Sequence, residues 1–588
     1  MIRRYYEDEL HYLYEAGKEF ARAHPEEARY LNIESVADRD PYVERLFEGF
    51  AFLTGRIRER LDDELPELTE ALFNLLWPHF LKPIPSLSIL EFTPRPGLVQ
   101  KTTVFPAGTE VRSAPVGDES AICRFRTTQD VRLQPMSLKD VTLNWPPGGT
   151  TVATLRFTLE KGIEYQQLQL NPLRLYFQAE DTVASMMHLF FTQHVDHITI
   201  SAGGAAVEIN GHRSVTPAGL AANEGLLPYS RYSFTGIRLL QEYLAFRRKF
   251  WFVDITGFDL LSPPPKTTEF EVKIFFDRAY PEEKRFKGEN VRLFCAPIVN
   301  LFRGDAEPIR LDHLLSEYRV TPDVRHPRSV EVYSVDAVAG TEDVTGDRHT
   351  YLPFYSFRHG NGGESRHYTT LVRPGPSDNH IAYISVGGLT MDRGDLPIET
   401  LSLEITCTNG TLPREKLQER MINQPAPDFS NVAAFENLTQ PTLDLHPLGS
   451  EALRSGERLD NFLWKLISHL SFNFMSVASL ESLRGLLDLY DWTGTDANKR
   501  RIAGIRDVRW VPKEIISRGA VLRGAEVTIE IQDGHFADEG DLCLFGLVMS
   551  NFFSMYASIN SFVHLNIVTK PSEQHYHWQP AKGMLPVI

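Results

Sequence analysis

The stretch of this sequence best suited to bind a ligand is glycine-rich and basic, Arg358-His-Gly-Asn-Gly-Gly-Glu-Ser-Arg-His367. Glycines beside basic side chains can hold an anion on exposed backbone amides. No helical pattern follows the stretch, so we interpret it as a connection between two β-strands. The alternative is a contact with an acidic protein partner through Arg358 and Arg366.

Three further groups have residue types that catalysis or metal binding could use. His575 and His577 supply two imidazoles, but no third and fourth ligands stand at a recognisable spacing. The acidic run at 62–64 falls in a predicted helix, where consecutive side chains point in different directions. Glu526 and Glu530 share one face of a predicted strand, yet nothing nearby completes a sugar site. We interpret all three groups as structural.

Compact catalytic signatures are absent from the sequence. It contains no G-x-x-x-x-G-K-[ST], no G-x-G-x-x-G after a strand, no H-E-x-x-H and no G-x-S-x-G. Cys123, Cys295, Cys407 and Cys543 are scattered without C-x-x-C spacing, which indicates neither a disulfide framework nor a thiolate zinc site. We predict no catalytic residues, no cofactor, no metal and no small-molecule substrate.

The charge balance argues against a nucleic-acid partner. The formal net charge is −16, whereas phosphate binding needs clustered Lys and Arg. Two short basic runs, Arg247-Arg248-Lys249 and Lys499-Arg500-Arg501, stand apart from each other. We interpret each run as a solvated face or a small contact with an acidic partner.

The hydropathy pattern predicts a cytoplasmic protein that does not insert into a membrane. The first 20 residues contain no continuous apolar core and no small-residue cleavage site, so they do not form a signal peptide. The longest apolar run, residues 542–549, is far shorter than the ~20 residues that span a bilayer. A reducing compartment also suits the scattered cysteines.

The elements that position these residues begin with a predicted long helix. Asp40 is a suitable N-cap and Pro41 occupies the first helical position. Apolar residues then recur every three or four positions as far as Leu65: Val43, Leu46, Phe47, Phe50, Leu53, Ile57 and Leu61. Pro66 ends or kinks this helix, and prolines near residue 85 close the segment. Residues 1–85 are therefore predicted to be a helical N-terminal segment.

Beyond Ser86 the apolar period changes from 3.6 to 2, which indicates β-strands joined by loops rich in Gly and Pro. Helical stripes return after residue 450, followed by a strand with Val527, Ile529 and Ile531 on one face. The sequence thus predicts an α+β fold with a β-rich domain at 86–265, a second one at 266–450 and an α+β domain at 451–588.

The most hydrophobic predicted helix carries Leu542, Phe545, Met549, Phe552 and Tyr556 on one stripe. Further apolar residues widen the stripe until little of the helix suits contact with water. Such a helix is buried in its own domain or covered by another subunit. Both alternatives remain open from the sequence.

Several blocks of this sequence, in order along the chain, together carry a family resemblance. The first block runs from Asp40 to Ser86 and includes V-E-R-L-F-E-G-F-A-F-L, L-D-D-E-L-P-E-L-T-E-A-L and W-P-H-F-L-K-P-I-P-S. Later blocks follow in order: F-W-F-V-D-I-T-G at 250–257, L-F-R-G-D-A-E-P-I at 301–309, E-Y-R-V-T-P-D at 317–323, S-H-L-S-F-N at 468–473, R-G-A-E-V-T-I at 523–529 and the block at 544–565. Together these blocks resemble the TssF (ImpG/VasA) family of bacterial type VI secretion systems, and Phe474-Met475 departs from the Tyr-Leu type of pair expected there.

The resemblance implies a structural baseplate wedge subunit, similar to wedge proteins of contractile phage tails. Such proteins assemble as two copies with one TssG, join TssK and TssE, and surround the VgrG spike in the cytoplasm, docked at the inner membrane through the secretion membrane complex. On apolar breadth, we expect Phe47, Phe50 and Ile57, and also Phe545, Phe552 and Tyr556, to pack against TssG or the second TssF copy.

One interpretation from another class remains. The β-rich middle and its acidic pairs also suit a cytosolic carbohydrate-active enzyme built from β-sandwich modules. Such an enzyme needs a pocket with convergent polar groups and carboxylates of perturbed pKa. A tail component of a phage-derived injection device is a third possibility, within the same mechanical class as a baseplate subunit.

Overall fold

The computed structural model describes residues 45–54, 82–146, 150–229, 235–354, 366–375, 379–387, 397–427, 429–447, 477–517 and 520–584, with Tyr6, Leu10 and Leu13. Contacts divide the chain into two units, Met1–Pro78 with Gly456–Lys465, and His79–Ser455 with Leu466–Ile588. In the first unit residues 45–54 are helical, as the sequence predicts for this part of the N-terminal helix. The rest of that predicted helix lies outside the described residues.

The second unit contains a six-stranded sheet built from distant parts of the chain. Its strands, in order across the sheet, are β24 (Ile422–Pro425), β3 (Glu110–Val116), β4 (Ala121–Thr127), β15 (Cys295–Val299), β1 (Leu87–Pro94) and β25 (Ala433–Asn437). A separate two-stranded sheet pairs β2 (Thr103–Phe105) with β5 (Val131–Leu133). Since β1 pairs with both β15 and β25, segments from the two predicted β-rich domains form one sheet.

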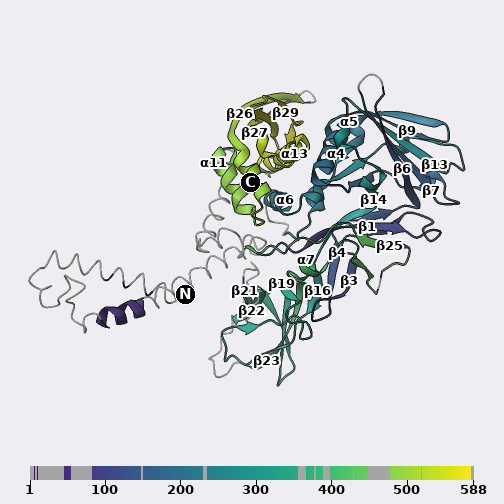
Figure 1. The fold of residues 1–588 in the computed structure, drawn as a ribbon. Coiled ribbons are helices and arrows are strands. Elements are labelled where there is room, and N and C mark those ends of the chain that lie inside the picture. Colours follow the sequence, from purple (N-terminus) through teal and green to yellow (C-terminus); the bar gives the residue numbers. More distant parts are fainter. Residues whose placement is uncertain are drawn as a thin grey trace, which may run out of the picture. The chain divides into compact units, whose positions relative to one another are not determined.

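Two further sheets accompany helix α4 (Asp181–Gln193) (Figure 1). The five-stranded sheet has the order β10 (Ala205–Asn210), β9 (Val195–Ala202), β13 (Glu269–Phe276), β7 (Val152–Leu159) and β6 (Met136–Asn144). The four-stranded sheet has the order β11 (Val215–Pro217), β12 (Phe252–Ile255), β8 (Leu173–Phe177) and β14 (Val291–Leu293). Strand β13 pairs with β7 and β9, so strand pairing crosses the boundary predicted at residue 265.

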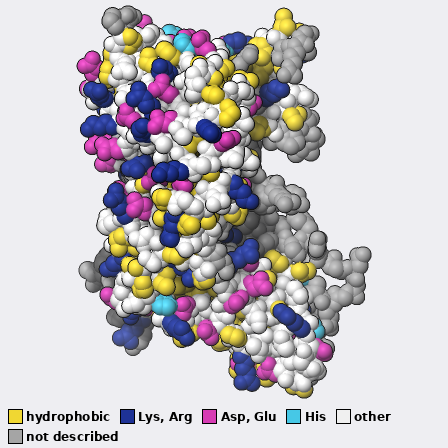
Figure 2. Space-filling model, turned by 90° about the vertical axis from the view of Figure 1, so that its right-hand side faces the viewer, with side chains coloured by type: hydrophobic (Ala, Val, Ile, Leu, Met, Phe, Trp, Pro, Cys, Tyr) yellow, Lys and Arg dark blue, Asp and Glu magenta, His cyan; other side chains and the backbone are white. Residues whose placement is uncertain are grey.

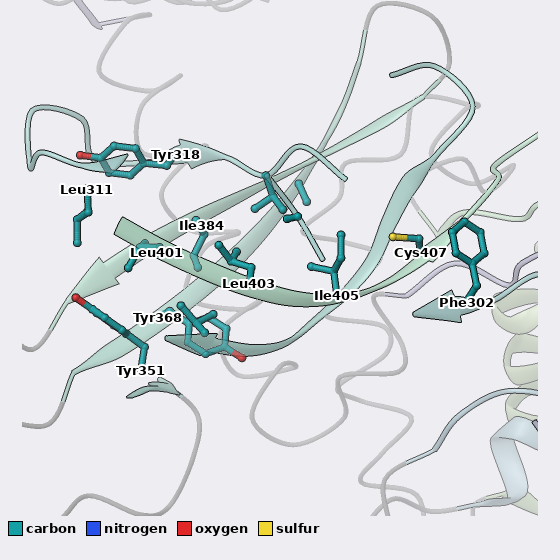
Figure 3. Packing of buried hydrophobic residues seen from close by; sticks show 14 residues of the cluster. Phe302, Leu311, Tyr318, Tyr351, Tyr368, Ile384, Leu401, Leu403, Ile405 and Cys407 are labelled. Atoms are coloured by element: carbon teal, nitrogen blue, oxygen red, sulfur yellow. The ribbon is translucent and has the colours of Figure 1, made fainter. Parts of the chain in front are cut away.

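An eight-stranded sheet surrounds the hydrophobic cluster drawn in Figure 3. Its strands are β16 (Phe302–Asp305), β23 (Glu399–Thr408), β19 (Glu331–Glu342), β20 (Arg348–Pro353), β21 (His367–Pro374), β22 (His380–Gly387) and β18 (Tyr318–Arg319), with β17 (Ile309–Leu311) also paired to β23. Along β23, Leu401, Leu403 and Ile405 are buried while Ser402 and Glu404 are exposed. This period-2 alternation is the pattern read from the sequence.

The C-terminal part is a β-α-β arrangement. Strands β27 (Ala520–Gln532) and β28 (Phe562–Lys570) pair in parallel, and helix α13 (Glu539–Tyr556) connects them. The sheet is completed by β26 (Ile505–Ser517), β29 (His575–His577) and β30 (Ala581–Lys582), and helices α11 (Leu480–Tyr490) and α12 (Asp496–Gly504) precede it. The predicted α+β class is therefore confirmed.

Candidate functional site

Helix α13 begins at a cap that also joins it to α4. The N-cap carboxylate of Asp538 accepts a hydrogen bond from the backbone N of Asp541 at 2.8 Å. The same carboxylate accepts one from Ser185 Oγ of α4 at 3.1 Å. Gly540 permits this approach, since a Cβ there would lie 2.5 Å from the Ser185 backbone. The cap thus fixes both the start of α13 and its distance from α4.

Asp541 is the centre of a buried ionic group, which we call the Asp541 cluster, formed with Arg247 and Arg501. Arg501 Nε donates to both carboxylate oxygens at 3.0 Å, and Arg247 donates to Oδ1. Asn498 Oδ1 accepts from Arg501 Nη1 at 3.0 Å. The Asp541 side chain is only 2% exposed, so the cluster holds the segment after α6 (Thr235–Ala245), helix α12 and helix α13 together inside the protein.

The basic runs that contain these arginines were interpreted as solvated faces or small contacts with an acidic partner, and for three of their residues this is wrong. Arg247 and Arg501 belong to the Asp541 cluster, and Lys249 is buried in an ion pair with Glu242. Each burial is accompanied by a carboxylate, as the cost of desolvating a charge requires. Sequence reasoning missed the arrangement because the partner of Arg247 is 294 positions further along the chain.

The body of α13 is covered by its own chain. Of its 18 residues 14 are buried, and it packs against α4, α6 and β28 (Figure 1). Phe545 and Phe552 are 2% and 0% exposed, and Tyr556, half-buried, has its ring centroid 5.1 Å from that of Phe552. Of the two alternatives for this helix, the structure has burial within its own unit. Phe545 and Phe552 consequently present no free surface to another subunit in this conformation.

Arg366, one of the two arginines of the glycine-rich stretch expected to contact an acidic partner, is mostly buried. Its guanidinium pairs with Glu399, which is 0% exposed and accepts a further hydrogen bond from Tyr351 Oη at 2.9 Å. Gly340 leaves room for this carboxylate, because a Cβ at that position would meet Glu399 Oε2. Arg366, which directly precedes β21, is thus joined to β23 through Glu399. Arg358 lies outside the described residues.

The described helix in the first unit exposes a stripe of apolar side chains. Leu46, Phe50 and Leu53 are 61%, 60% and 60% exposed, and their spacing of four and three places them on one face. Phe47 is half-buried, and Ile57 lies outside the described residues. An exposed stripe of this kind is the usual surface of a helix that docks into a groove.

A second apolar surface lies on the hairpin of β26 and β27, and sequence reasoning did not single it out. Pairing with β28 begins only at Ala525, so residues 513–517 and 520–524 form a two-stranded extension that we call the hairpin arm. Ile516 and Val521 lie opposite each other on the arm and are 82% and 62% exposed. A two-stranded ribbon is marginally stable in water by itself, so its exposed apolar pair suits contact with another protein.

Of the acidic pair Glu526 and Glu530, Glu526 is held by hydrogen bonds within the C-terminal sheet. Glu526 accepts hydrogen bonds from Lys513 Nζ at 2.5 Å and Asn566 Nδ2 at 2.8 Å, and these hydrogen bonds lower the pKa of its carboxyl group. A glycosidase acid needs the opposite shift. Glu526 therefore acts as a structural anion in the sheet.

Charges of both signs are interspersed on the face of the molecule drawn in Figure 2. Within the part of the chain that the structure describes, no group of three or more His, Cys, Asp or Glu side chains is arranged to hold a metal ion. In the same residues, none of the helices has the length and apolar character needed to cross a bilayer.

Several interleaved sheets, a buried ionic cluster and exposed apolar side chains suit a protein that makes contacts with other proteins. The family model described as "Type VI secretion system, TssF" matches residues 1–584. The chain is 28% identical to the type VI secretion system component TssF1 of Pseudomonas aeruginosa, over 100% of this chain and 99% of that protein. This chain belongs to the TssF family of the type VI secretion system.

Solved structures agree with this assignment. A chain of the type VI secretion system TssK-TssF-TssG baseplate subcomplex is 34% identical, with a TM-score of 0.78 over 91% of this chain and 98% of that chain. A chain of a type VI secretion baseplate complex is 30% identical, with a TM-score of 0.64 over 100% of both chains.

Proposed function

We propose that this protein is a non-catalytic wedge subunit of a type VI secretion baseplate in the cytoplasm. Two copies join one TssG-type subunit, bind TssK- and TssE-type subunits, and surround a VgrG-type spike. In this assembly the protein supports sheath assembly and contraction. The baseplate docks at the inner membrane through the secretion membrane complex. The observation that carries the proposal is the likeness, over 91% of this chain, to a chain of the TssK-TssF-TssG subcomplex.

The helix at residues 45–54 is proposed to contact the TssG-type subunit or the second copy of this chain. Its exposed stripe of Leu46, Phe50 and Leu53 supports this role, since aromatic and aliphatic residues supply most of the energy at the centre of an interface. Phe545 and Phe552 are not included, because the chain's own core buries both.

The test is co-expression of the tagged full-length chain with the TssG- and TssK-type subunits of the same organism, followed by native mass measurement. We expect a complex with two copies of this chain per TssG-type subunit. Recovery of this chain alone under gentle conditions would contradict the proposed assembly.

A pair of variants tests the helix contact within the same experiment. Phe50→Asp should lower the affinity for the TssG-type subunit or the second copy at least about tenfold, the factor given by ~1.4 kcal/mol. Glu48→Gln is the matched control, because Glu48 is exposed on the same helix without belonging to the apolar stripe. An intact complex with Phe50→Asp would exclude this helix as the contact and leave the proposed function standing.

A further inference from the structure

A cavity of about 590 Å³ in the second unit is lined by three cationic side chains from separate segments. Lys82 precedes β1, Arg126 lies near the end of β4, and Arg303 belongs to β16. We call it the basic cavity. Tyr333 and Pro228 add apolar surface to its wall.

None of the three cations has a direct ion-pair partner among the described residues, although the Asp336 carboxylate attracts Lys82 and Arg126 from further away. Within the described residues, no hydrogen-bond acceptor contacts their side-chain nitrogens, and no carboxylate lies within 4.0 Å of those atoms. Lys82 Nζ instead lies 5.2 Å from the centre of the Tyr333 ring. The Asp336 carboxylate, which also lines the cavity, accepts hydrogen bonds from Thr406 Oγ1 at 2.6 Å and Ser334 Oγ at 2.7 Å.

The electrostatics of the cavity favour an added anion. Burial lowers the pKa of Lys82, and the charge of Asp336 acts in the opposite direction. Burial also lowers the pKa of Arg126; Tyr333 and Asp336 act against this shift, and the positive charge of Arg303 adds to it. A carboxylate that accepts several charge-assisted hydrogen bonds would stabilise the half-buried Lys82 and Arg126 beside the exposed Arg303.

The acidic residues of the cavity restrict which anion fits. Asp305, Asp336 and Glu404 line it and are exposed, whereas Lys82 and Arg126 are half-buried. Exposed carboxylates repel a polyanion such as nucleic acid and attract basic groups. A ligand with one carboxylate between two positive charges matches both the inner cations and the outer acids.

We propose that the basic cavity binds an acidic side chain of a partner protein, presented on a segment in which basic residues flank it. The carboxylate lies against Lys82, Arg126 and Arg303, and the flanking cations face Asp305, Asp336 and Glu404. This site goes beyond the proposed baseplate function, because it depends on no particular partner subunit.

The test uses three probes with the full-length chain: a capped Lys-Glu-Lys peptide, a capped Lys-Gln-Lys peptide and inorganic phosphate. Isothermal titration should show that Lys-Glu-Lys binds at least about tenfold more tightly than Lys-Gln-Lys, which corresponds to ~1.4 kcal/mol. Arg303→Gln should lower the affinity for Lys-Glu-Lys by a similar factor, and because Arg303 is exposed the variant is expected to fold.

The control is Arg420→Gln, an exposed arginine outside the cavity whose partner is Glu436. Its affinity for Lys-Glu-Lys should be unchanged. Equal affinity for the Glu and Gln peptides, or no binding of either, would overturn the proposal. Phosphate binding as tightly as Lys-Glu-Lys would also overturn it, because the cavity would then be a site for free inorganic anions.

Discussion

Replacement of Asp541 by Asn is the most informative perturbation of this fold. The carboxylate is the shared acceptor of Arg247 and Arg501, and it also accepts from the backbone N of Ala537 at 3.1 Å. Asn preserves the shape but removes the negative charge. Two arginines then remain buried without a counter-charge, with side chains only 13% and 9% exposed.

The magnitude follows from burial. Removing one partner of a buried ion pair destabilises a protein by about 3–5 kcal/mol, since the remaining charge stays desolvated. Glu539→Gln, two positions earlier on α13, is the matched control. Glu539 pairs with Arg278 at 2.8 Å, but these side chains are 30% and 40% exposed, so the loss should be under about 1 kcal/mol. Both substitutions remove one negative charge from the first turn, so any effect on the helix dipole is shared.

The assay is native-state hydrogen exchange of peptides covering residues 539–556, which reports the free energy of opening of α13. We expect Asp541→Asn to lower that free energy by about 3–5 kcal/mol and Glu539→Gln by under about 1 kcal/mol. Equal effects of the two variants would refute the reasoning, because the Asp541 cluster would then contribute no more than an exposed pair.

Three further predictions follow from burial. Burial lowers the pKa of His188 to about 4, so on acidification the unfolded state binds a proton before the folded state does. The free energy of unfolding should therefore fall by about 2 kcal/mol from pH 7 to pH 5. Urea unfolding at the two pH values should show this loss in the original protein and not in His188→Phe. Burial raises the pKa of Cys123 and Cys407 to about 12, so iodoacetamide at pH 8 should label both thiols only after the protein is unfolded. Mass spectrometry measures the labelling, and labelling of either thiol in the folded protein would contradict this prediction. Phe552→Ala should destabilise α13 by about 3–5 kcal/mol in the exchange assay, whereas Phe50→Ala, at an exposed site, should change stability by under about 0.5 kcal/mol.

Local periodicity was enough to predict single elements. The alternation that placed Val527, Ile529 and Ile531 on one strand face is found in β27, where all three are 0% exposed. The alternation indicates which side chains share the buried face of a strand, and this does not depend on which other strands pair with it.

The grouping of strands could not be predicted, because it depends on partners far away in the chain. Strand β1 pairs with β15 and β25, which begin at Cys295 and Ala433. The Asp541 cluster has the same origin, since Arg247 and Arg501 approach one carboxylate from different segments. The sequence shows that a residue is charged, but it does not show which distant residue neutralises that charge.

The burial of α13 by its own chain could not be predicted for the same reason. A helix that is apolar around most of its surface must be covered by neighbouring elements, but this pattern does not indicate whether those elements belong to the same chain. Here α4, α6 and β28 supply them, and Gly546 lets the Trp578 ring approach where a Cβ would lie only 2.2 Å away. Exposure, and not hydrophobic breadth, is therefore the better guide to surfaces that are free to contact other proteins. The exposed apolar side chains include the stripe of Leu46, Phe50 and Leu53 and the Ile516–Val521 pair of the hairpin arm.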